Sequence, residues 1–330
     1  MKDAVSRFEP GNASRSVTAG STLPYLAASG GVTLGATLVF DCATAISRLY
    51  SNLPAAEDPS SGAALQPDSA QSSQAAIAAY PYIQVDLGDT GHHLHKDHLN
   101  QGQGEFHLVN AGHTRRLATL MPIPVLGNGQ QGYRPWHTTY AYLASMFDWD
   151  DLSKAYGKTD LLQFLCAQGS AAALHCETVT APRSSACRYL CDAVAAAIGL
   201  GEQCSFLKGQ GDWHLRSALT PSALRSAGAD PYQFRIRLLH HRNQPQPYLD
   251  PRPMWQQLLE DLQEQAPASV MASRFYLGLI QGVADLLGLL AETHAVEAIA
   301  ISGRMLQHPT LGNAAVRSLL ARMAPTAQVA

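Results

Sequence analysis

The sequence of 330 residues contains little charge, and the charge it has is nearly balanced. Only 15% of the residues are charged, and 23 Lys and Arg stand against 26 Asp and Glu. Because no basic stripe gathers phosphate-neutralising side chains, we expect no nucleic-acid partner. Hydrophobic residues make up 46% of the chain, which is typical of a globular protein with a substantial buried core.

Long apolar runs and a leader sequence are also missing. No uninterrupted apolar stretch approaches the roughly 20 residues that a membrane-spanning helix needs. The first ten residues lack the apolar core of a secretory signal. We therefore expect no membrane partner and a cytoplasmic location.

The six cysteines form no Cys-x-x-Cys pair. In the cytoplasm they would stay reduced. Cys187 and Cys191 are one helical turn apart beside an apolar stripe. We expect them to pack in the core, and the alternative is a thiolate role.

Strand patterns dominate the first part of the chain. Residues 31–40 are rich in β-branched and apolar side chains, and Tyr82–Leu87 alternates with a period of two. Two further strands are expected at 105–109 and 116–121, at a spacing that suggests antiparallel pairing. A helix through Ile46 and Leu49 is expected between the first two strands.

Two segments have too few apolar residues to offset the entropy of ordering them. Residues 1–24 are expected to form a loose lead-in, and residues from about 54 to 76 a disordered or flexible segment. The remaining chain, 25–330, is expected to form a single domain around that segment.

Helical patterns follow from residue 137 onward. The expected helices cover 137–147, 160–171, 185–199, 253–265, 270–294 and a last one around 314–323, after a short buried strand at 296–301. Ser184 or Ser185 can cap the third of them, and Gly199 or Gly201 can end it. Strands, then helices, then a strand–turn–helix ending indicate a mixed α/β protein.

Separated motifs in this chain occur in the order of one known family. They are Gly104–Val109 with Arg115–Pro124, then Arg134–Trp136, Arg183–Leu200 and Ala298–Gln307. Together they resemble the carboxy-terminal, Kae1-like carbamoyltransferase half of HypF, the [NiFe]-hydrogenase maturation protein of the actin-like ATPase superfamily. The resemblance extends over about residues 82–320, and it covers the first 80 residues poorly.

The resemblance implies a bilobed, actin-like ATPase (Kae1-like) fold of the α/β class, truncated and with a helix-rich C-terminal half. It also implies transfer of a carbamoyl group from an adenylate to the terminal cysteine of the partner HypE. The positions that it assigns to nucleotide or cofactor binding are Asp89, Gly91, Gly104, Arg134, Ser184, Ser185, Asp192, Gly209, Ser302 and Gly303.

Several of these positions have a second interpretation. Asp192 either faces the cleft or positions its helix, and the two serines either contact phosphate or cap the helix. Arg134 and Trp136 either line the old cleft or stack on each other to close a turn.

Four histidines occupy the loop where the family has phosphate-binding glycines. They are His92, His93, His95 and His98, between Asp89-Thr-Gly91 and Gly104. Only glycine lets the backbone approach phosphates closely, so phosphate binding is expected to be weak or lost. Residual ATP or anion binding at the Ser302-Gly303 turn stays open. The imidazoles could instead bind Ni²⁺ or Zn²⁺.

The family's metal ligands have no counterpart in the sequence. No histidine precedes His92, and the late acidic segment of the family is absent before Ala330. The leading expectation is therefore a non-catalytic accessory or regulatory relative, with a HypE-like protein or a hydrogenase subunit as partner. The alternatives are an active ATP-dependent carbamoyltransferase with a remodelled site, and a nickel or zinc delivery protein that uses the His92–His98 loop.

Overall fold

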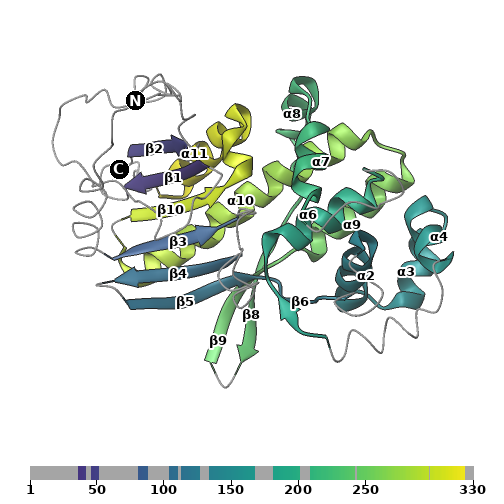
Figure 1. The fold of residues 1–330 in the computed structure, drawn as a ribbon, viewed down its shortest axis with the longest axis horizontal. Helices are drawn as coiled ribbons and strands as arrows, with labels where there is room; N and C mark the ends of the chain where they lie inside the picture. The colour runs from purple at the N-terminus through teal and green to yellow at the C-terminus, as the bar shows by residue number, and fades with distance from the viewer. Residues whose placement is uncertain are drawn as a thin grey trace, which may run out of the picture.

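The computed structural model describes residues 36–41, 46–51, 81–87, 104–110, 113–126, 134–167, 181–200, 209–241, 244–296 and 298–323. A mixed eight-stranded sheet lies beside a half made mainly of helices (Figure 1). The strand order is β2-β1-β10-β3-β4-β5-β9-β8. The expected α/β class is confirmed, whereas the lead-in at 1–24 and the segment at about 54–76 lie outside the described residues.

The centre of the sheet follows the predicted alternation. β3 (Tyr82–Asp86), β4 (Glu105–Asn110) and β5 (His113–Leu120) pair antiparallel in chain order, and β10 (Ala298–Gly303) lies parallel to β3. Ile83 and Val85 are fully buried, while Gln84 between them is exposed. The period-two pattern thus reports a sheet with one face in the core.

The first hairpin corrects one prediction. β1 (Ala36–Asp41) pairs antiparallel with both β10 and β2 (Ile46–Ser51). The helix expected through Ile46 and Leu49 was therefore wrong. A segment this short gains little from helix formation, whereas pairing with β1 gives hydrogen-bond partners to alternate residues along its length.

The long helices appear where their periodicity predicted them, within a few residues. The described helices are α2 (Pro135–Met146), α3 (Trp149–Tyr156), α4 (Asp160–Ala167), α6 (Cys187–Ala197), α7 (Gly211–Ser217), α8 (Pro221–Ala227), α9 (Arg252–Gln263), α10 (Ala268–His294) and α11 (Pro309–Met323). The remaining elements are β6 (Ile123–Pro124), β7 (Arg183–Ser184), β8 (Arg235–His241), β9 (Gln244–Asp250) and the short 3₁₀ helix η2 (Arg304–Gln307).

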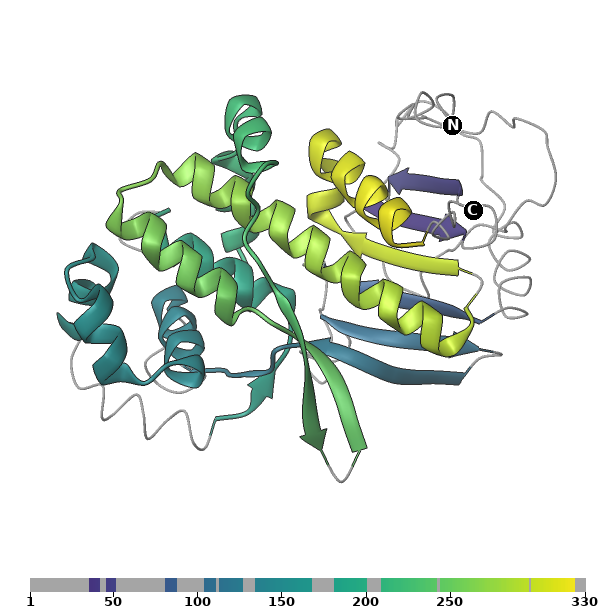
Figure 2. The same ribbon diagram turned by 180° about the vertical axis from the view of Figure 1, so that it is seen from behind.

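Helix α10 crosses both halves of the molecule (Figure 2). By length and apolar composition alone it could span a membrane, but 67% of its most apolar window is buried inside the protein. Gly278 permits this packing, because a Cβ there would lie 2.0 Å from the carbonyl oxygen of Tyr232. The burial identifies α10 as a core helix that ties the two halves together.

Helix α6 ends as its sequence predicts. Gly199 has φ +72°. The N–H of Leu200 donates to the carbonyl oxygen of Ala195 at 2.9 Å, and the N–H of Gly199 donates to the carbonyl oxygen of Ala196. This is the Schellman arrangement, which requires a left-handed residue after the last turn. Cys187 and Cys191 are 1% and 4% exposed, so their predicted packing in the core is also seen.

Candidate functional site

Two polar side chains meet where the parallel strands β3 and β10 end. Ser302 is in register with Asp86, and its hydroxyl donates to Oδ1 of Asp86 at 3.0 Å. The N–H of Leu87 donates to the carbonyl of Ser302 at 2.7 Å. Figure 1 shows this end of β3 facing the helical half. The carboxyl edge of parallel strands is where α/β folds bind ligands, so this edge is the first candidate site.

Gly104 joins that edge to the loop before α6. It has φ +70°, its N–H donates to the carbonyl of Asp86 at 2.8 Å, and a Cβ would lie 2.0 Å from the carbonyl oxygen of Ser185. We call Asp86, Gly104, Ser302 and Gly303 the Asp86 edge. Glycine is required at position 104 for close packing of two backbones, and its amide is already used by the protein.

The two serines before α6 do not cap the helix as predicted. The N-cap residue is Ala186, which makes no side-chain cap bond. Ser184 is buried, and its hydroxyl accepts from the N–H of Ala186 at 3.2 Å. The capping prediction was therefore wrong: the Ser184 hydroxyl closes a local serine turn one step before the helix begins.

Asp192 is fully buried in the middle of α6. Its Oδ2 accepts from the N–H of Gly209 at 2.8 Å, and its Oδ1 accepts from the N–H of Gly211 at 2.7 Å. A Cβ on Gly211 would lie 2.4 Å from the Cα of Asp192. We call these three residues the Asp192 knot. It favours the positioning interpretation of Asp192, because the carboxylate holds the start of α7 against α6.

The knot has polar and thiol neighbours that are also held inside the protein. The Tyr276 hydroxyl donates to Oδ1 of Asp212 at 2.7 Å, and Nε of Arg216 donates to Oδ2 of the same carboxylate at 2.9 Å. A hydrogen bond with Cys187, together with burial, raises the pKa of Cys191 well above its ordinary value. A thiol held protonated is a weak nucleophile, which disfavours the thiolate interpretation.

Arg134 lies at the start of α2 and is exposed. Trp136 packs edge-on against His137 at 4.0 Å and Phe164 at 6.1 Å between ring centroids. Within the described part of the chain, the Arg134–Trp136 stacking considered above is not formed. Burial, and then the positive charge of Arg134, lower the pKa of His137 to about 4, so this imidazole is neutral near pH 7.

Apart from Arg134 and Ser184, which are described above, the predicted residues separate into three groups. Gly104, Ser185, Ser302 and Gly303 gather at the Asp86 edge, while Asp192 and Gly209 form the knot. Asp89, Gly91 and the four histidines His92, His93, His95 and His98 lie outside the described residues, and their roles remain predictions. Among the residues that the structure describes, no group of three or more His, Cys, Asp and Glu is arranged to hold a metal ion.

Asp86 was missed by the sequence reasoning, which selected Asp89 three residues later. The sequence did place Asp86 at the end of a period-two strand. In the structure β10 pairs with this strand in parallel. Only the register between β3 and β10 brings its carboxylate to the Ser302 hydroxyl, and that register is not visible in the sequence.

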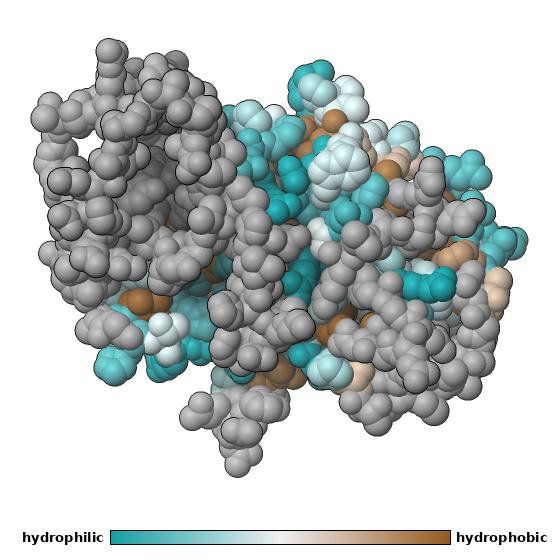
Figure 3. Space-filling view, viewed as in Figure 1, coloured by the Kyte–Doolittle hydropathy of each residue, from teal (hydrophilic) through white to brown (hydrophobic). Residues whose placement is uncertain are grey.

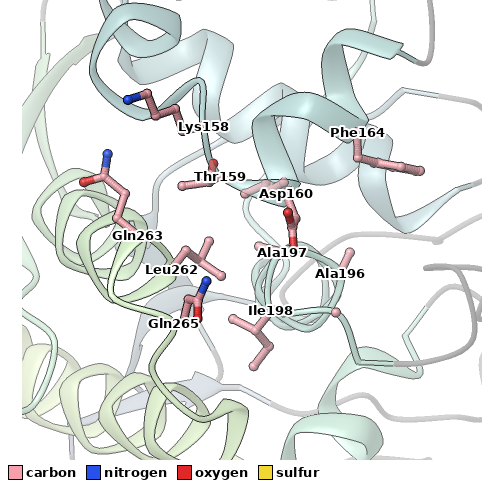
Figure 4. A pocket seen from close by; sticks show the side chains of 12 residues that line it. Lys158, Thr159, Asp160, Phe164, Ala196, Ala197, Ile198, Leu262, Gln263 and Gln265 are labelled. Carbon is pink, nitrogen blue, oxygen red and sulfur yellow. The ribbon is translucent and has the colours of Figure 1, made fainter.

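A cavity of about 540 Å³ lies in the helical half, among α4, the end of α6 and the end of α9 (Figure 4). Its walls include Phe164, Ile198 and Leu262, with Asp160 and Gln265 among the polar lining residues. The cavity is at the carboxyl end of α6, whereas Ser185 contacts the Asp86 edge before its amino end. An 11-residue helix is about 16 Å long, so the two sites are separate.

One family model matches more than half of the chain. The sequence pattern described as "Carbamoyltransferase, Kae1-like Domain, second subdomain" matches residues 102–327. No curated protein sequence matches the chain significantly. Two solved structures share its fold at 17% identity each: full-length HypF in the phosphate- and nucleotide-bound form (TM-score 0.50, covering 75% of this chain) and T. kodakarensis HypF (TM-score 0.51, covering 73%).

The chain is much shorter than these similar proteins. The match covers 36% of the full-length HypF chain and 30% of the T. kodakarensis HypF chain. At this identity the likeness concerns the fold alone. The expected Kae1-like fold is confirmed by the family match and the two structures together.

Proposed function

Because this chain belongs to the family of the carbamoyltransferase Kae1-like domain, second subdomain, we propose that it acts in [NiFe]-hydrogenase maturation as a HypF-like protein without catalytic activity. In this role it is an accessory or regulatory protein, and its partner is a HypE-like protein or a hydrogenase subunit. The likeness of its fold to that of two HypF proteins supports the maturation role.

The observation that carries the non-catalytic part of the proposal is the Asp192 knot. Asp192 lies in the segment that most resembles the family, yet its carboxylate is fully buried, and each of its oxygens accepts a backbone N–H. A carboxylate with these two bonds holds the fold together, and because it is fully buried it presents no surface to a metal or a nucleotide.

Gly104 and Gly209 support the same proposal. A phosphate cradle needs backbone N–H groups that point into the cleft and are free to donate. The N–H of Gly104 donates to Asp86, and the N–H of Gly209 donates to Asp192. At these two positions the glycines serve internal packing, so the chain keeps the residue type without the phosphate-binding use.

The direct test is release of AMP from ATP in the presence of carbamoyl phosphate, Mg²⁺ and a HypE-like acceptor, whose terminal cysteine takes the carbamoyl group as the AMP leaves. We expect no release above the rate without protein, while a full-length HypF in the same assay releases AMP. Release that depends on carbamoyl phosphate, and that disappears in the Ser302→Ala variant, would contradict the proposal and favour an active enzyme with a remodelled site.

The maturation role is tested separately, by co-purification of the chain with HypE and with hydrogenase subunits from cells that make active hydrogenase. We expect one of them to be retained at a defined stoichiometry. Restoration of hydrogenase activity by this chain in cells that lack HypF would identify a catalytic role instead.

A further inference from the structure

The β8–β9 hairpin leaves the body of the protein. β9 joins the sheet through only two residue pairs, Thr119 with Tyr248 and Leu120 with Leu249. Beyond them the hairpin projects away from both halves (Figures 1 and 2). β8 is the last strand in the sheet order, and it pairs only with β9 among the described strands. The hairpin therefore has two long edges that pair with no other described strand over most of their length.

The edge formed by β9 is blocked. The N–H of Met121 donates to the carbonyl of Leu249 at 3.1 Å, so the backbone polar groups of Leu249 face β5 and not β8. Because direction alternates along a strand, Pro247 and Pro245 face the same way. Proline has no N–H, and two prolines at alternate positions prevent another strand from pairing with this edge.

The edge formed by β8 is open. Leu238 is opposite Pro247, and Ile236 is opposite Leu249. The N–H and C=O groups at these two β8 positions therefore point away from β9, toward the outer side of the hairpin. No proline interrupts β8. Two edges of one hairpin thus differ in whether they can accept an extended chain.

The side chains along β8 combine apolar and positive character. Leu238 is 59% exposed and Leu239 is 37% exposed, which places both among the large exposed hydrophobic residues of the protein. Arg235 and Arg237 lie on the same face as Leu239, and both are exposed. Hydrophobic residues also reach the surface where the hairpin leaves the body (Figure 3).

We propose that the outer edge of β8 binds an extended, acidic segment of another protein by adding it as a further strand. Backbone groups at Ile236 and Leu238 would form the ladder, Leu238 would contact the apolar residues on its own face, and Arg235 and Arg237 would pair with carboxylates on the other face. The inference does not depend on the proposed function.

The charges favour this partner over a second copy of the chain. Two copies of β8 paired antiparallel about Ile236 or about Arg237 would place arginines of the two copies directly opposite each other. Like charges on neighbouring strands are destabilising. Arg237 has a local carboxylate, Asp250, but the contact is 3.4 Å long and the Arg237 side chain remains 53% exposed.

The test uses a short fluorescent peptide in which Glu alternates with Val and Thr, and a matched peptide with Lys in place of Glu. Fluorescence anisotropy of the full chain should give an affinity for the Glu peptide about tenfold higher than for the Lys peptide. The Arg235→Glu/Arg237→Glu variant should reverse this preference. Arg225→Glu, which changes an exposed arginine on α8, should leave it unchanged.

Backbone pairing is tested by Leu238→Pro. Because Leu238 faces away from β9, this proline removes an outward donor and no bond of the hairpin, and the thermal unfolding temperature should stay close to that of the wild type. Binding of the Glu peptide should be lost, whereas Leu289→Ser, a change at another exposed leucine, should bind normally.

Equal affinity for the two peptides, or unchanged binding by Leu238→Pro, would overturn the proposal. So would sedimentation that shows a dimer abolished by Leu238→Pro, because it assigns the edge to a second copy.

Discussion

The Asp192 knot and the Asp86 edge each combine a carboxylate with residues of family-like motifs, but the surroundings of the two carboxylates differ. Asp192 is fully buried, and both of its oxygens accept backbone N–H groups from one loop. Asp86 is only partly buried and accepts a hydroxyl from a neighbouring strand. A fully buried carboxylate is expensive to leave unpaired, whereas a side-chain hydroxyl can rotate toward a ligand. The knot therefore fixes the fold, and the edge is the place where any remaining ligand binding would occur.

The largest effect is expected from Asp192→Ala. The substitution leaves the N–H groups of Gly209 and Gly211 buried without their acceptor, and we expect a loss of about 3–5 kcal/mol in the free energy of unfolding. Urea denaturation measures it. The control Asp151→Ala removes a carboxylate that is 80% exposed, and should cost less than about 0.5 kcal/mol. Similar losses for the two variants would remove the distinction between the knot and an ordinary surface acid.

Gly278→Ala tests the packing that holds the two halves together. A Cβ at Gly278 would lie 2.0 Å from the carbonyl oxygen of Tyr232, and overpacking of this kind costs about 1–3 kcal/mol. Gly288→Ala is the matched control on the same helix, because the nearest atom is a side-chain carbon at 3.4 Å. It should be neutral or stabilising by up to about 1 kcal/mol through helix propensity. Equal thermal unfolding temperatures for the two variants would contradict the close contact.

His137 makes the stability of the helical half depend on pH. Its pKa is lowered to about 4 in the folded protein by burial and by Arg134. Between the ordinary pKa near 6.5 and pH 4, the unfolded chain gains a proton that the folded chain does not. Stability should therefore fall as the pH decreases through this range, by on the order of 1–3 kcal/mol, and the contribution of His137 to this fall should be complete below about pH 4.

Burial also lowers the pKa of His294 and His308, so these histidines contribute to the same pH dependence. Two variants separate the contribution of His137 from theirs. His137→Gln should flatten the part of the pH profile that belongs to His137, whereas His113→Gln, at an exposed position, should leave the profile unchanged. The readout is the slope of unfolding free energy against pH, so a constant loss of stability in either variant does not affect it. An unchanged slope in His137→Gln would contradict the assignment.

The smallest effect is expected at the Asp86 edge. Ser302→Ala removes one partly buried hydrogen bond to Asp86, which is worth about 0.5–1.5 kcal/mol. Urea denaturation of this variant, compared with Asp192→Ala, measures the difference between the two regions directly. A loss at Ser302 as large as that at Asp192 would show that the edge is a structural element as well.

Periodicity predicted the central strands and the long helices, because they bury one face along many residues. It was wrong at Ile46–Ser51, where two apolar residues at helical spacing lie in a strand whose partner decides its conformation. The β8–β9 hairpin was not predicted, and the prolines at 245 and 247 would argue against a strand in this part of the sequence. They are tolerated because both face away from β8.

The site was less predictable than the fold for a related reason. The motif containing Asp192 suggested its importance but not its partners, since Gly209 and Gly211 follow after 17 and 19 residues and meet it only through the packing of α7 on α6. The pairing of Asp86 with Ser302 spans 216 residues and depends on strand register. The residue types identified the candidate positions, and the tertiary contacts determine whether each one holds the fold together or lies at the candidate site.

The most direct test of a Kae1-like fold without a working phosphate site is calorimetric titration of the whole chain with ATP and Mg²⁺, with full-length HypF as the positive control. Since the amides of Gly104 and Gly209 and the Asp192 carboxylate are engaged within the protein, we expect no heat of binding at micromolar nucleotide. Clean one-to-one binding with a low-micromolar Kd would contradict this conclusion.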